Sequence, residues 1–303
     1  MIGETGSDSL RMEGEETSYS RMIALGGLGN DVIFGGFGSD YVYGDHSVSS
    51  ESKVQQLLGY LRTNPDFKNA SVRNQAADYL NPADGSDQAS MRNGGFDTIA
   101  TYDGADFIDS GNETVSPLRN GIPSVYYRPD GTPFADSEYD AAGILIGLES
   151  KPHIVQSVHG DIIMSGSGND VIFAGTGNDE ISGGSGENYV DAGAGHDIID
   201  ARESSGQFYG GAGEDRIDWD YIAGTNIVVD GGPDEDILST VLNDKPNEVY
   251  LSKDASSSAA ILRVREDKTD LAQAYDHISL THLENVILEL KGGDDDLDIG
   301  DLL

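Results

Sequence analysis

A nine-residue period constrains what residues 156–218 can fold into. An acidic or amide side chain recurs on this period, with Gly206 as the one exception: Asp161, Asp170, Asp179, Asn188, Asp197 and Asp215. An apolar side chain follows each position two residues later: Ile163, Ile172, Ile181, Val190, Ile199, Phe208 and Ile217. A fixed period this short predicts a solenoid in which each repeat contributes one turn and one short strand.

Glycines fill most of the positions before each acid. Glycine permits positive φ and close backbone approach, so these positions can turn sharply, and the next three residues form a strand whose central side chain points inward. Two nonapeptides then make one coil of eighteen residues, so side chains eighteen apart stack. This predicts one edge that carries Asp161, Asp179, Asp197 and Asp215. The other edge starts with Asp170 and Asn188 and fails at Gly206.

Stacked carboxylates repel one another unless cations lie between the turns. Paired carboxylates and backbone carbonyls form an all-oxygen site, and calcium accepts six to eight such ligands with tolerant geometry. Magnesium prefers tighter octahedral sites with waters, and zinc prefers His or Cys. We therefore expect firm calcium sites on the first edge. Weaker or absent sites follow Asp170 on the second edge, because Asn188 lacks a charge and Gly206 lacks a side chain.

Two tandem segments carry the period in its cleanest form. Residues 26–34 read GGLGNDVIF and residues 35–43 read GGFGSDYVY, with partial copies near residues 3–10, 94–108 and 231–238. This pattern resembles the nonapeptide G-G-x-G-x-D-x-U-x, with U apolar, of the RTX family of secreted bacterial proteins. The resemblance implies an all-β fold, a right-handed parallel β-roll that binds calcium in its turns. Asp31 and Asp40 then lie on opposite edges, and Asp97 and Asp106 can stack on them if the segment between loops out.

Together these arguments give a set of candidate metal-binding positions and an expected total of roughly four to nine calcium ions. The side-chain candidates are Asp31, Asp40, Asp97, Asp106, Asp161, Asp170, Asp179, Asn188, Asp197, Asp215 and Asp236. The candidate turn glycines are Gly27, Gly29, Gly36, Gly38, Gly166, Gly168, Gly175, Gly177, Gly193, Gly195, Gly211 and Gly213.

The composition agrees with a metal-dependent fold. With 18 Lys and Arg against 54 Asp and Glu, the formal net charge is -36. Such a charge is also typical of disordered chains, so we expect a repelling coil without metal. It disfavours nucleic acid and anionic membranes as partners. The chain has no cysteine, no apolar run of transmembrane length and no secretory signal at Met1.

The period divides the chain into repeat blocks and insertions. We expect repeats at 1–44 and 94–112, a main roll at 158–240 and a β-rich continuation at 241–303. The 45–93 insertion predicts a helical hairpin, with a helix over 52–62 and a second marked by Val72, Ala76, Tyr79 and Leu80. The alternative is a partner-binding excursion.

The 113–157 insertion predicts a β-hairpin with a turn at Pro129-Asp130-Gly131. Its aromatic residues cover a sheet edge or, alternatively, contact a glycan or protein ligand: Tyr126, Tyr127, Phe134 and Tyr139. Neither end of the chain shows a solenoid cap, so we expect a segment of a longer protein. A C-terminal export signal at residues 298–303 is the alternative.

Catalytic motifs are missing from the sequence. The six histidines include no H-E-x-x-H pair, and there is no G-x-S-x-G elbow. The resemblance implies export through a type I secretion machinery to the cell exterior or surface. We therefore expect a non-enzymatic calcium-binding segment with a structural or adhesive role. The alternatives are an accessory module of a secreted protease, lipase or alginate epimerase, or the repeat region of a pore-forming cytolysin.

Overall fold

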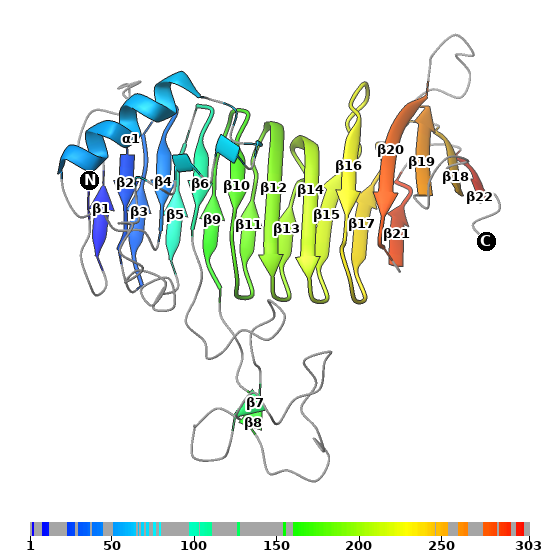
Figure 1. Ribbon diagram of the computed structural model, residues 1–303. Coiled ribbons are helices and arrows are strands. Elements are labelled where there is room, and N and C mark those ends of the chain that lie inside the picture. Colours follow the sequence, from blue (N-terminus) through cyan, green and yellow to red (C-terminus); the bar gives the residue numbers. More distant parts are fainter. Residues whose placement is uncertain are drawn as a thin grey trace.

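The computed structural model describes most of the repeat blocks and parts of the insertions. The described residues are 2, 8–11, 23–27, 30–36, 38–44, 51–64, 66, 68–69, 71–72, 75–76, 79, 97–102, 104–110, 126–127, 154–155, 160–245, 247–253, 260–265, 275–283, 285–291 and 295–299. Short parallel strands alternate between two facing sheets as the chain coils along the axis of the molecule (Figure 1). The predicted parallel β-roll is confirmed.

One sheet has nine strands, and all its neighbouring strands are parallel. In spatial order it consists of β1 (Ser9–Arg11), β3 (Val32–Phe34), β5 (Thr98–Ala100), β9 (Ile162–Met164), β11 (Glu180–Ser182), β13 (Ile198–Asp200), β15 (Arg216–Asp220), β17 (Ile237–Val241) and β21 (Asn285–Glu289).

The other sheet has eleven strands. In spatial order it consists of β2 (Ile23–Leu25), β4 (Tyr41–Tyr43), β6 (Phe107–Asp109), β10 (Val171–Phe173), β12 (Gly186–Ala194), β14 (Ser204–Ala212), β16 (Ile227–Asp230), β20 (Asp276–Thr281), β19 (Ala260–Arg265), β18 (Glu248–Lys253) and β22 (Asp296–Ile299). Strands β20, β19 and β18 pair antiparallel, so the coiling pattern changes in the C-terminal region.

The register explains the core. Equivalent apolar residues of successive coils pair directly, as Ile163 does with Ile181 and Ile181 with Ile199. These side chains are completely or almost completely buried between the two sheets, together with Phe208 and Trp219. Burial of one such aliphatic side chain contributes about 1.5–3 kcal/mol. Each coil therefore adds an apolar layer that it cannot bury without its neighbours.

The predicted insertion between the first two repeat blocks does loop out of the roll. Strand β4 pairs with β6 although residues 44–106 separate them in the sequence. Helix α1 (Glu51–Thr63) confirms the first predicted helix, and the described residues of the second, including Val72 and Ala76, are also helical; Leu80 lies outside the described residues.

Helix α1 lies across one end of the eleven-stranded sheet (Figure 1). Its Leu57 and Leu61 are fully buried in a second apolar cluster that contains Leu25, Tyr43 and Phe107 from the outer face of strands β2, β4 and β6. Helix α1 therefore packs on the outer face of the roll. None of the described helices combines the length and apolar character that a membrane span requires.

The described residues of the second insertion form one short antiparallel pair. Strand β7 (Tyr126–Tyr127) pairs with β8 (Ile154–Val155). The predicted turn at Pro129, Phe134 and Tyr139 lie outside the described residues. The predicted hairpin around that turn therefore stays a prediction, and β8 is a further partner that the turn signal does not indicate.

Candidate metal centre

The acids of the nonapeptides form two columns, one along each edge of the roll. We call the first the long column: Asp31, Asp97, Asp161, Asp179, Asp197, Asp215 and Asp236. We call the second the short column: Asp40, Asp106, Asp170 and Asn188. Every one of these side chains is at most 2% exposed, although aspartate is almost never fully buried without compensation. The columns therefore need a compensating interaction.

One carboxylate oxygen of each column residue is used by the fold itself. The backbone N–H of Asp161 donates to Oδ1 of Asp179 at 2.6 Å, and Asp179 donates in the same way to Asp197 at 2.8 Å. The bond repeats along the long column from Asp8 to Asp236 at 2.6–2.9 Å. The short column repeats it from Asp40 to Asn188 at 2.7–2.9 Å. These bonds tie each coil to the next.

The other carboxylate oxygen is buried inside the turn. Within the described part of the chain, Oδ2 has no hydrogen-bond donor in six of these residues: Asp31, Asp106, Asp170, Asp179, Asp197 and Asp215. In Asp31 and Asp215 it lies close to the first glycine of the same turn, since a Cβ added at Gly26 or Gly210 would lie 2.5 Å from Oδ2. A buried anionic oxygen without a donor costs several kcal/mol unless a cation neutralises it.

The turn backbone brings carbonyl oxygens close to these carboxylates. Gly166 and Gly168 have φ of 90° and 148°, a region that favours glycine. Each packs directly on the preceding coil, since a Cβ at Gly168 would lie 1.4 Å from the carbonyl oxygen of Gly104. The same contact recurs between Gly195 and Gly213. The stacked turns therefore bring carbonyl and carboxylate oxygens close together. A side chain larger than glycine would fill the space between them.

Burial and mutual repulsion raise the carboxyl pKa values in both columns. Desolvation, followed by the charge of Asp179, raises the pKa of Asp197 to about 9. Desolvation is also the main cause that raises the pKa of Asp106 and of Asp215 to about 7 and that of Asp170 to about 6. The pKa of Asp179 lies well above its ordinary value for the same reasons. Ionised columns at neutral pH therefore require positive charge in the turns.

The donor set fits calcium. Among the described residues, no three His, Cys, Asp or Glu side chains converge closely enough to hold a metal by themselves. Backbone carbonyls would therefore complete a site formed by the Oδ2 atoms, which gives the hard, all-oxygen ligand set that calcium accepts. Nδ1 of His196 accepts the N–H of Glu214 at 3.0 Å, so this nitrogen joins two coils at the surface.

The predicted positions fall where the period places them. The stacking of Asp161, Asp179, Asp197 and Asp215 is confirmed. Asp31 and Asp40 lie on opposite edges and are bonded to Asp97 and Asp106 across the looped-out segment, as expected. Of the predicted glycines, Gly29 lies outside the described residues. A ligand role for any of these residues remains a prediction.

Sequence reasoning missed a set of hydroxyl groups that join successive turns. Thr101, Ser110 and Ser165 occupy the first turn position, and their hydroxyls donate to carbonyl oxygens of the next coil at 2.8–2.9 Å. The signal was available, because Ser or Thr replaces the first glycine only in these incomplete copies. The hydroxyls stabilise the stack where the glycine pattern is imperfect.

A parallel roll with glycine-rich turns and stacked buried aspartates defines a calcium-binding repeat protein. The family model of the RTX calcium-binding nonapeptide repeat matches residues 23–45, 93–113 and 161–201, in four copies. These segments are RTX repeats, and RTX repeats bind calcium. The comparison with curated proteins gave no match. The long column continues past the matched residues to Asp215 and Asp236, so the geometry of the repeat extends further than its recognisable sequence.

Proposed function

We propose that this chain is a structural or adhesive module of an extracellular bacterial protein that folds when calcium fills its turns after secretion. RTX repeats indicate a calcium-binding module of a secreted bacterial protein. The observation that carries the proposal is the long column, whose buried aspartates stack from coil to coil with one oxygen bonded to the fold. In Asp179, Asp197 and Asp215 the second oxygen has no donor in the described structure.

Calcium would act on folding through the charge of this column. Without a cation, the folded chain must bury carboxylates that repel one another, whereas the unfolded chain leaves them in water. A cation that binds only the folded state stabilises it by its binding free energy. Extracellular calcium modules have dissociation constants near 10⁻⁴–10⁻³ M, so such a chain stays unfolded in the cytosol and folds outside. This agrees with type I secretion, which is typical of the RTX family.

A structural or adhesive role, without catalysis, is supported by the way the acidic residues are used. The column aspartates hold the coils together, and their burial leaves them inaccessible to a substrate. On the outer faces, Asp200 and Asp218 are paired with Arg202 and Arg216. The regular stack suits a spacer, and the insertions at 45–93 and 113–157 provide surfaces for a glycan or protein ligand.

A calcium titration followed by circular dichroism tests the proposal. We expect little β signal in chelator at pH 7 and a cooperative gain of β structure as calcium rises toward the millimolar range. Magnesium at equal concentration should give a much smaller gain, because it demands a rigid octahedral site. Equal β content in chelator and in calcium would refute calcium-dependent folding.

A further inference from the structure

The short column ends in an amide. Oδ1 of Asn188 accepts the backbone N–H of Asp170 at 2.9 Å, as an aspartate in this position does. That bond fixes the orientation of the amide, because a backbone donor must face the oxygen. Nδ2 therefore points into the turn, where it donates to the carbonyl oxygen of Gly183 at 2.6 Å and to Oγ of Ser204 at 3.0 Å. A donor stands where the other column residues place an anionic oxygen.

Ser204 completes the closure of this turn. Its hydroxyl donates to the carbonyl oxygen of Gly184. It occupies the fourth position of its nonapeptide, where other turns have glycine, as at Gly168 and Gly186. Its own carbonyl oxygen accepts the indole N–H of Trp219 at 3.0 Å. The carbonyls of Gly183 and Gly184 thus receive protein donors, and the network continues into the core.

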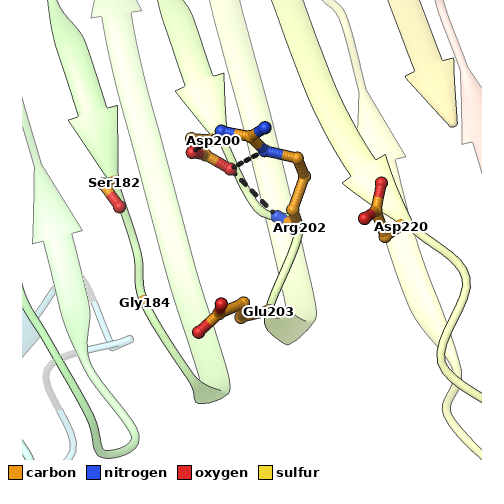
Figure 2. A pocket seen from close by; sticks show the side chains of 6 residues that line it. All are labelled: Ser182, Gly184, Asp200, Arg202, Glu203 and Asp220. Atoms are coloured by element: carbon orange, nitrogen blue, oxygen red, sulfur yellow. Dashed lines mark hydrogen bonds and ion pairs between the residues drawn. The ribbon is translucent and has the colours of Figure 1, made fainter. Parts of the chain in front are cut away.

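A positive charge lies in the same region. Figure 2 shows Arg202, in the second turn position, with its guanidinium bound to Asp200 through Nε at 2.9 Å and Nη2 at 2.6 Å. It lines a cavity of about 430 Å³ together with Ser182, Gly184, Asp200, Glu203 and Asp220. The hydrogen bond from Arg202 is the main cause that lowers the pKa of Asp200, opposite in sign to the shifts in the columns. Arg202 therefore neutralises Asp200 on the outer face next to this turn.

We propose that Asn188 and Ser204 replace the cation at this point, so that the second edge is closed by protein donors and binds no calcium from Asn188 onward. The inference rests on the proposed calcium-binding function. It revises the expectation that Asn188 is a metal ligand, because its amide nitrogen bonds the carbonyl oxygen of Gly183, which a calcium ion would otherwise contact. Asp170, one coil earlier, keeps an Oδ2 without a donor in the described structure and marks the last cation-binding position of the short column.

The test compares calcium stoichiometry with stability in the full chain. N188A and S204A are measured beside D170A. N169A serves as the matched control, because Asn169 is an exposed asparagine on the same edge whose Oδ1 also accepts an N–H of the next coil, that of Glu187 at 3.0 Å, outside the buried turn. Bound calcium is counted by equilibrium dialysis. Urea unfolding in saturating calcium is followed by the fluorescence of Trp219, the only tryptophan. We expect N188A and S204A to bind as many ions as the wild type but to unfold at lower urea. D170A should lose about one ion per chain. N169A should keep every ion and lose less stability than N188A, because the bond that it removes is exposed to solvent.

The outcomes separate this inference from the function on which it rests. Loss of an ion in N188A would overturn the closure while calcium binding by the repeats stands. Unchanged urea midpoints in both N188A and S204A would also overturn it. A wild-type chain that binds no calcium would overturn the proposed function and this inference with it. If N188A does not fold, S204A decides, since it removes one hydroxyl and keeps the amide.

Discussion

Replacement of Asp197 by asparagine should stabilise the metal-free fold and weaken the calcium-loaded fold. Asparagine keeps an oxygen that can accept the N–H of Asp179, which lies 2.8 Å from Oδ1 in the native chain. It removes the charge that burial and Asp179 make costly. In calcium the same change removes an anionic ligand. The two conditions should therefore give effects of opposite sign.

The size of the metal-free effect follows from the pKa of Asp197. Burial raises this pKa to about 9 from 3.8, so at pH 7 the folded chain must hold a proton that the unfolded chain has released. That difference costs about 4 kcal/mol at pH 7, at roughly 1.4 kcal/mol for each pH unit above the unfolded pKa. D197N removes this cost and can raise the free energy of unfolding by up to that amount in chelator.

Two measurements at pH 7 separate the effects. In chelator, circular dichroism should show more β structure in D197N than in the wild type. In saturating calcium, urea unfolding followed by Trp219 fluorescence should give D197N a lower midpoint, with about one fewer bound ion. D200N is the matched control, because Arg202 lowers the pKa of Asp200, so its loss should not stabilise either state. If D197N shows no more β structure than the wild type in chelator, the electrostatic account of the column is wrong.

Two further predictions concern pH and the glycines. The folded pKa values of about 9, 7, 7 and 6 for Asp197, Asp106, Asp215 and Asp170 exceed 3.8, so the metal-free fold binds more protons than the unfolded chain between these values. Its stability should be greatest near pH 4 and fall as the pH rises through 6–9. Circular dichroism in chelator should thus show more β structure at pH 5 than at pH 8, and the reverse order would contradict the shifts. G168A should unfold at much lower urea in calcium, by about 3 kcal/mol or more, because its Cβ would lie 1.4 Å from the carbonyl oxygen of Gly104. G59A, on the exposed side of α1 with nothing within 4 Å, should gain up to about 1 kcal/mol, and similar losses in both variants would refute the stacking argument.

The sequence predicts the roll well because the length of the sequence repeat fixes which residues stack in successive coils. Residues eighteen apart must stack if two nonapeptides form one coil, as Asp161 and Asp179 do. The same argument relates Asp31 to Asp97 across 66 residues, because the phase of the repeat is kept on both sides of the insertion.

Other features depend on contacts that no period encodes. From the sequence, Asn188 is interpreted as a weaker metal ligand than aspartate because it has no charge. Only the structure shows that its amide donates to both Gly183 and Ser204. The partner of Tyr126 and Tyr127 is a strand 28 residues away, which a local turn signal does not reveal. In the C-terminal region the sequence predicts a β-rich continuation. It does not predict the antiparallel pairing of the strands at Glu248 and Ala260, because alternating apolar residues suit either direction.

The position of helix α1 has a consequence for the order of folding. Its apolar side chains rest on strands β2, β4 and β6, and β6 follows the helix in the sequence. An isolated helix of 13 residues is marginal in water. The surface on which it docks exists only after the coils that contain β2, β4 and β6 have formed. The helix should therefore dock late, and its docking should indicate that these first coils are folded.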